Sequence, residues 1–209
     1  MSHDDFAVEP VKGLPELPPE GERILWQGRP STWALAVDAL NLKWVAGYFG
    51  ALFLWRFISV SGTLPLDLAV AASVPFLVLG GVCCGLLLLF ALLQARCTVY
   101  TITNRRVAMR IGAALTVTLN LPYTRILNAD LALGKNGTGT IALELEGPVR
   151  FGYLTCWPHV RPWHFKTQPA LRCIPDAERV AALLADAAEA RVTQPRIERR
   201  PTPNAIAAE

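Results

Sequence analysis

Residues that could perform chemistry are few in this chain and lie far apart. Its 209 residues include three histidines and five cysteines. The cysteines form no C-x-x-C pair and stand at Cys83, Cys84, Cys97, Cys156 and Cys173. His159 and His164 lie between the last two cysteines, but the spacing matches no known set of zinc ligands. We therefore predict no metal site.

No recognised catalytic motif is present either. The chain lacks a P-loop, a G-x-S-x-G elbow, an H-E-x-x-H helix and a G-x-G-x-x-G turn. The acidic residues between positions 176 and 189 lie on the exposed side of an amphipathic helix, where a solvated face explains them. We predict a protein without catalytic residues and without a cofactor.

One segment has the composition of a binding site. Residues 157–165 combine aromatic, basic and proline residues, and tryptophan and arginine are enriched where proteins bind partners. Prolines also reduce the entropy lost on ordering. The predicted partner-binding residues are Trp157, His159, Arg161, Trp163 and Phe165. The alternative is that these aromatic side chains cover one end of a domain or sit among lipid headgroups.

Two smaller groups of residues suit a membrane. Arg105, Arg106 and Arg110 follow an apolar stretch closely and are predicted to contact anionic headgroups, or only to set topology. Gly81 and Gly85 form a G-x-x-x-G motif, which allows close helix packing and self-association. The net charge of +3 comes with no basic stripe, so we expect no nucleic-acid partner.

The elements that must carry these residues begin with two apolar stretches. Residues 68–93 contain no charge, and a helix needs roughly 20 residues to cross the hydrocarbon core. Residues 44–60 form a shorter stretch whose Arg56 lies near its end, where the side chain can reach the headgroups. The sequence predicts two transmembrane helices, with Pro75 as a site for a kink in the longer one.

Charge asymmetry predicts the orientation of this pair. The connecting residues 61–67 contain no lysine or arginine, whereas basic residues flank both outer ends. By the positive-inside rule, both termini are expected on the cytoplasmic side of a bacterial inner (intracytoplasmic) membrane. Residues 31–43 precede the first span, and they read either as an interfacial amphipathic helix or as an extension of that span.

A period of two follows the second stretch. Short segments rich in β-branched residues predict strands at residues 97–103, 107–111, 115–121, 128–133 and 140–146, with a further strand at 149–155. Residues 175–191 then predict an amphipathic helix. The predicted domains are residues 1–30 (a flexible arm and a first domain segment), 31–95 (the membrane part), 96–192 (a cytoplasmic domain) and 193–209 (a disordered tail).

Three motifs resemble the bacterial membrane-linked pleckstrin-homology-like (PH-like) domains. Residues 22–30 read E-R-I-L-W-Q-G-R-P, residues 100–107 read Y-T-I-T-N-R-R-V, and residues 121–126 read L-P-Y-T-R-I. The resemblance implies an α+β membrane protein, in which a transmembrane helical hairpin precedes a PH-like antiparallel barrel or sandwich capped by a C-terminal helix.

The segment 157–177 is in addition similar to the photosynthetic-complex assembly proteins of purple phototrophic bacteria. That similarity implies a non-enzymatic helper that binds reaction-centre and core light-harvesting subunits, or their other assembly factors. No histidine lies in either apolar stretch, which disfavours a stable pigment carrier. The alternative is a general membrane-tethered module that binds lipid or protein and has no link to photosynthesis.

Overall fold

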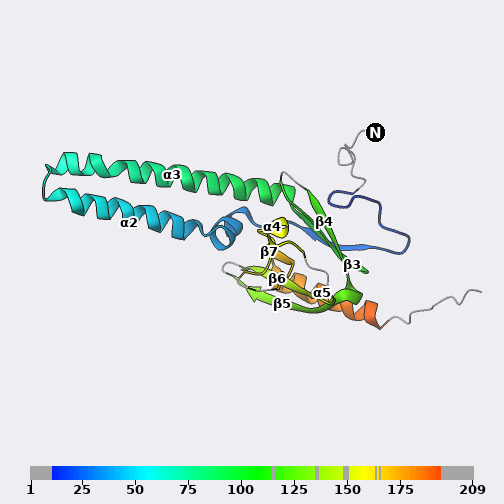
Figure 1. Cartoon of the computed structure of the whole chain (residues 1–209). Coiled ribbons are helices and arrows are strands. Elements are labelled where there is room, and N and C mark those ends of the chain that lie inside the picture. The colour runs from blue at the N-terminus through cyan, green and yellow to red at the C-terminus, as the bar shows by residue number, and fades with distance from the viewer. Residues whose placement is uncertain are drawn as a thin grey trace, which may run out of the picture.

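A computed structural model of the chain describes residues 11–113, 116–134, 137–147, 151–162, 164 and 166–193. Two long antiparallel helices project from a small domain (Figure 1). They are α2, Leu42–Ser61, and α3, Leu66–Cys97, which continues through Pro75. The two predicted apolar helices are thus present, and both are long and apolar enough to cross a membrane.

The surface of this helical pair is unusual for a water-soluble protein. Only 6% of the most apolar window of α2 and 11% of that of α3 are buried. A core helix of a soluble domain would be mostly covered by the rest of the chain. The outer ends of the pair meet at the domain, and the turn after Ser61 lies at the far tip (Figure 1).

The segment before α2 is separate from the first span, so the prediction that residues 31–43 extend that span is wrong. It forms α1, Thr32–Ala34, and a short π-helix η1, Leu35–Ala39, and Asn41 in a left-handed conformation separates it from α2. Leu35 and Ala36 are fully buried. Leu35, Ala36 and Leu40 pack inside the protein against α3 and the domain. Trp33 is 61% exposed, and an interfacial position of this segment stays a prediction.

The domain contains two antiparallel sheets. The first has the order β1-β2-β3-β4 and the second the order β5-β6-β7. The strands of the first sheet are β1 Ile24–Gly28, β2 Val99–Thr103, β3 Arg106–Ile111 and β4 Val117–Pro122. The strands of the second are β5 Ile126–Leu133, β6 Thr138–Leu145 and β7 Ala170–Pro175. The sheets form no closed barrel in the described part, so the predicted antiparallel domain is confirmed only as an open arrangement.

Three strand assignments made from the sequence need correction. β1 lies in the predicted first domain segment, residues 22–30, which was not assigned as a strand, and β7 was not predicted at all. The expected strand at residues 149–155 is wrong in its described part, because α4, Tyr153–Cys156, forms there instead. A 3-10 turn, η2, Tyr123–Arg125, links the two sheets.

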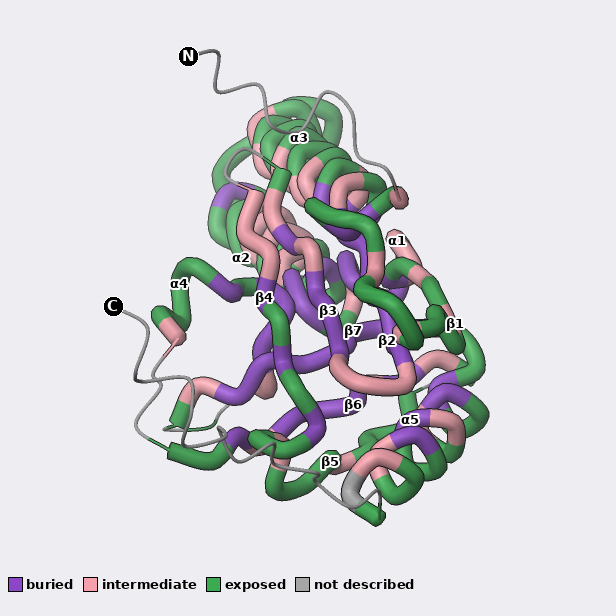
Figure 2. The backbone as a smooth tube through the Cα atoms, turned by 90° about the vertical axis from the view of Figure 1, so that its right-hand side faces the viewer, coloured by how far each residue is buried: buried purple, intermediate pink, exposed green. Residues whose placement is uncertain are grey.

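The core lies between the two sheets and under the last helix, α5, Ala177–Val192. Val180, Leu184 and Ala187 recur at helical spacing and face this core, which confirms the predicted amphipathic helix. Buried residues run along β2, β3, β6 and β7, while the outer turns of α5 remain exposed (Figure 2). Cys156 and Val160, from the segment between the two parts of the second sheet, are buried in this core.

Candidate functional site

Trp157 lies where the domain meets α3. Its indole stacks on Phe90 of that helix, with ring centroids 5.7 Å apart and planes inclined by 24°. The side chain is 37% exposed, so one face packs on the helix and the other remains open. Trp163 and Phe165, the other aromatic residues of the predicted binding segment, lie outside the described residues.

His159 is in the interior and not on a binding surface. It is fully buried, and both ring nitrogens have partners: Nε2 lies 3.1 Å from Thr98 Oγ1, and Nδ1 lies 2.6 Å from the Tyr100 hydroxyl. That hydroxyl also accepts the backbone N–H of Arg172 at 3.2 Å. The prediction that His159 contacts a partner is therefore wrong, because the ring is satisfied within the core.

This network has a defined protonation state. The Tyr100 hydroxyl accepts from the Arg172 backbone, so its own proton is available to His159 Nδ1, and Nε2–H then donates to Thr98. Burial, together with a smaller effect of the positive charge of Arg172, lowers the pKa of His159 to about 3. Burial also raises the pKa of Tyr100 above its usual range. Both rings are therefore neutral at physiological pH.

Arg161 is a surface residue with partners in its own domain. Its side chain is 38% exposed and pairs with the carboxylate of Asp130 on β5. The same guanidinium donates to Gln168 Oε1 at 3.1 Å. Its role in partner binding stays a prediction, and its contacts connect Gln168 to β5 of the second sheet.

Arg105 and Arg106 hold the N-terminal segment. Arg106 Nε donates to Glu22 Oε1 at 2.9 Å, and Arg105 Nη2 donates to the Glu20 carbonyl at 3.1 Å. Asn104 of the same turn donates to the Gly21 carbonyl and accepts from the Arg23 N–H, each at 2.9 Å. The motifs at residues 22–30 and 100–107 therefore bind one another.

The distance of each arginine from the end of α3 affects whether its side chain can reach lipid headgroups. The β2–β3 turn lies at the end of the hairpin away from α3 (Figure 2), whereas Arg110 pairs with Val99, two residues after α3 ends. Headgroup contact by Arg105 and Arg106 is disfavoured by their distance from α3 and by their contacts with the N-terminal segment. Arg110 remains at the helix-proximal end.

The glycines of α3 divide between two roles. A Cβ atom built at Gly80 would lie 2.6 Å from Phe49 Cβ, so this glycine permits α2 and α3 to touch. At Gly81 and Gly85 such an atom would meet nothing within 4 Å. The predicted packing motif is therefore not used inside the hairpin and leaves open space beside it.

Sequence reasoning missed the most distinctive charged residue, Arg172 on β7. It is only 7% exposed, and its guanidinium donates to the Pro158 carbonyl at 3.1 Å and the Asp38 carbonyl at 2.9 Å. It thereby ties η1, the exit of α4 and β7 together. The sequence feature that could have indicated a buried charge is the single arginine within the apolar residues 170–174, A-L-R-C-I.

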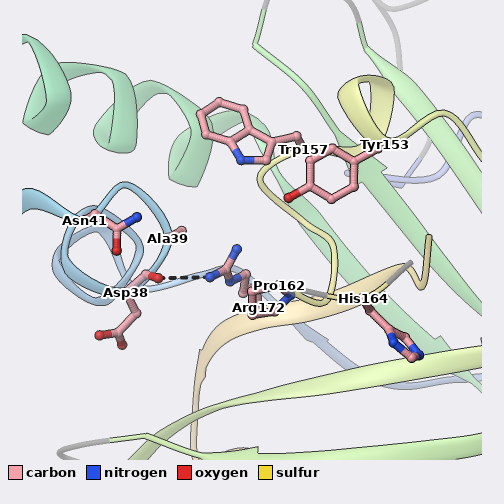
Figure 3. A pocket seen from close by; sticks show the side chains of 8 residues that line it. All are labelled: Asp38, Ala39, Asn41, Tyr153, Trp157, Pro162, His164 and Arg172. Atoms are coloured by element: carbon pink, nitrogen blue, oxygen red, sulfur yellow. Dashed lines mark hydrogen bonds between the residues drawn. The ribbon is translucent and has the colours of Figure 1, made fainter. Parts of the chain in front are cut away.

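The Arg172 side chain lies at a hollow of about 510 Å³ beside the start of α2 (Figure 3). The hollow is lined by Asp38, Ala39, Asn41, Tyr153, Trp157, Pro162, His164 and Arg172. We call it the juxtahelical pocket. Among the described residues no three His, Cys, Asp or Glu side chains gather in a metal-binding arrangement, and the chemistry of this pocket is that of hydrogen-bond donors and aromatic rings.

Comparison with known proteins identifies relatives of the whole chain. A protein of Rhodobacter capsulatus described as an uncharacterized 23.7 kDa protein in the puhA 5′ region is 46% identical over 211 residues, covering 100% of this chain and 99% of the relative. No solved structure matches significantly. The model of the bacterial PH domain family matches residues 41–188, a range that includes both long helices and most of the two sheets. The chain therefore belongs to the bacterial PH domain family.

Proposed function

We propose that this chain is a non-enzymatic assembly factor for the photosynthetic reaction centre and its core light-harvesting complex, of the PuhB type. The observation that carries this proposal is the relative from the puhA 5′ region, which is similar from end to end and not only in the PH domain. That genomic context is consistent with a photosynthesis-related role. The segment 157–177, which suggested this branch, includes structural residues of the domain such as His159 and Arg172.

In this proposal α2 and α3 cross the inner (intracytoplasmic) membrane as a hairpin. Their apolar side chains are exposed to the surroundings along most of their length, which lipid would cover at low cost. Trp44 and Tyr48 are 80% and 61% exposed at the domain end of α2, as expected of aromatic residues at a membrane interface. Both termini and the PH-like domain would then lie in the cytoplasm.

An assembly factor of this kind would need one surface that binds partners within the bilayer and another that binds them in the cytoplasm. Within the bilayer, the open flank of α3 at Gly81 and Gly85 supports close approach of a partner helix or a second copy of this chain. On the proposed cytoplasmic domain, Trp157 is partly exposed beside α3, and Arg161 is partly exposed beside β5. Reaction-centre subunits, core light-harvesting subunits or other assembly factors are the proposed partners.

Deletion of the gene in a phototrophic host tests the role. Membranes of the deletion strain should contain less reaction centre and core antenna, measured by absorption spectra, while total bacteriochlorophyll precursors continue to form. A plasmid copy of the wild-type gene should restore both complexes, and an empty plasmid should not. Normal complex levels in the deletion strain would refute the assembly role and favour a general membrane-tethered lipid- or protein-binding module.

Capture of partners provides an independent measurement. The tagged chain, purified from gently solubilised phototrophic membranes, should carry reaction-centre or core-antenna subunits identifiable by mass spectrometry. An unrelated membrane protein with the same tag and a similar expression level controls for nonspecific capture.

A further inference from the structure

We propose that the juxtahelical pocket binds the phosphodiester headgroup of an anionic phospholipid, with Arg172 as its charged anchor. The inference rests on the membrane placement argued under the proposed function, but not on the photosynthetic role. It concerns a different place from the arginines Arg105, Arg106 and Arg110, which the sequence had suggested for headgroups.

The first argument is the state of Arg172. A buried guanidinium keeps its charge at any physiological pH, and it normally has a carboxylate partner. Among the described residues Arg172 has none, and its only side-chain hydrogen bonds go to the two carbonyls of Asp38 and Pro158. A guanidinium has more N–H donors than these two bonds use. An anion in the pocket would compensate the charge and accept the remaining donors.

Neutral donors surround that charge. Asn41 precedes α2 in a left-handed conformation with φ of 55°, and its side chain makes no capping hydrogen bond. Figure 3 shows the Asn41 amide and the Tyr153 hydroxyl beside the hollow that the Arg172 guanidinium borders, whereas the His164 ring points away from that guanidinium. A phosphate group has several acceptor oxygens, so it could accept hydrogen bonds from the guanidinium and from the neutral donors at the same time.

The position of the pocket indicates a lipid as the source of the phosphate. Asn41 is the residue immediately before α2, so the pocket lies at the level where the apolar helix begins. The Trp157 indole, stacked on Phe90 of α3, forms an apolar wall on the same side. A phospholipid placed with its phosphate at Arg172 would have its acyl chains beside the exposed apolar surface of the hairpin.

The charge of the pocket favours a monoanion. Asp38 contributes its backbone carbonyl to Arg172, and its exposed carboxylate points away from the guanidinium (Figure 3). A dianionic phosphate would experience more repulsion from that carboxylate than a phosphodiester with one negative charge. Phosphatidylglycerol has such a headgroup, whereas the net charge of phosphatidylcholine is zero.

Binding to the purified full-length chain in neutral detergent tests the proposal. Dioctanoyl phosphatidylglycerol should bind saturably and raise the melting temperature, and dioctanoyl phosphatidylcholine should bind at least about fivefold more weakly. Arg172→Gln should abolish this preference. Arg161→Gln is the matched control, because it removes a neighbouring arginine that does not line the pocket, and it should keep the preference.

A second pair of variants covers the case in which Arg172→Gln does not fold. Asn41→Gly tolerates the left-handed backbone and removes only the amide, and Tyr153→Phe removes only the hydroxyl. Each should weaken phosphatidylglycerol binding severalfold without changing the melting temperature of the lipid-free protein. Full affinity in both variants would overturn the pocket assignment.

Glycerophosphoglycerol, which is the phosphodiester headgroup of phosphatidylglycerol without its acyl chains, separates a lipid from a soluble ligand. If it binds as tightly as dioctanoyl phosphatidylglycerol, the site takes a soluble phosphate compound and the lipid assignment is wrong. Equal binding of the two lipids would also overturn it. The binding assay uses purified protein, so its result does not depend on the deletion experiment. Absence of lipid binding would refute the pocket assignment but not the assembly role, and a normal deletion strain would refute the assembly role but not the pocket assignment.

Discussion

Arg106, at the start of β3, pairs with Glu22, just before β1, with Nε and Oε1 2.9 Å apart across a sequence separation of 84 residues. The glutamate side chain is only 2% exposed, and the arginine side chain is 26% exposed. The pair therefore lies mostly out of solvent, and it fastens the segment before β1 to the β2–β3 turn. Arg106 therefore contributes to the fold, and its contact with lipid headgroups stays a prediction.

Removal of the carboxylate should reveal this role. We expect Glu22→Ala to lower the free energy of unfolding by about 1–3 kcal/mol, less than for a fully buried pair because Arg106 is partly solvated. Thermal or urea unfolding in mild detergent, followed by tryptophan fluorescence, measures the change. Glu20→Ala is the control: only the backbone carbonyl of Glu20 is used, so the stability should change by less than about 0.5 kcal/mol.

Neutral His159 should make the domain sensitive to acid. The pKa is about 3 in the folded chain and roughly 6.5 when unfolded, so between these values the unfolded state binds more protons. Stability from this residue is then complete above pH 6.5 and decreases as the pH falls. The expected loss between pH 7 and pH 5 is about 2 kcal/mol.

The matching measurement is the pH dependence of unfolding in His159→Gln. This variant should lose that part of the slope between pH 7 and pH 5, whatever its absolute stability. His164→Gln removes an exposed histidine close by and is the control for replacing a histidine by glutamine in this segment. An unchanged slope in His159→Gln would contradict the neutral, buried assignment.

Sequence patterns located the long helices well because their signal is local. The absence of charge in residues 68–93 and the length of the run are sufficient to define α3, and the observed helix extends the prediction by a few residues at each end. The five strands between residues 97 and 146 were also found within a few residues, since alternation and turn residues are local features.

The features that were missed depend on distant partners. β7 is a strand because it pairs with β6, and its charge at Arg172 is accommodated by carbonyls from η1 and from the exit of α4. The burial of His159 likewise depends on Thr98 and Tyr100, which are 61 and 59 residues away. The partners in these contacts are too far apart in the sequence for a local pattern of a few residues to include both.

Gly80 should matter more than its neighbour in the same helix. We expect Gly80→Ala to destabilise the hairpin by about 1–3 kcal/mol, because the added methyl group would collide with the fixed Cβ of Phe49. Gly81→Ala should have almost no effect on the isolated chain, since its position opens onto free space. Melting of each purified variant in mild detergent makes the comparison.

A double variant distinguishes a collision from a general loss of flexibility. If Phe49 is the obstacle, Phe49→Ala should remove most of the penalty of Gly80→Ala, which appears as a coupling energy in the double-mutant cycle. Equal effects of Gly80→Ala in the presence and absence of the Phe49 ring would contradict the contact.

The orientation of the hairpin can be tested at its tip. The turn between α2 and α3 contains no basic residue, whereas Lys43 and Arg96 lie at the domain ends of the two helices. Because lysine and arginine are retained in the cytoplasm, we expect the tip in the periplasm and both termini in the cytoplasm. Alkaline phosphatase inserted after Thr63 should then be active, and the same enzyme fused to Glu209 should be inactive. Green fluorescent protein fused to Glu209 should fluoresce. Activity of phosphatase at both positions would place the domain outside the cytoplasm, and activity at neither would show that the exposed apolar helices do not cross the membrane.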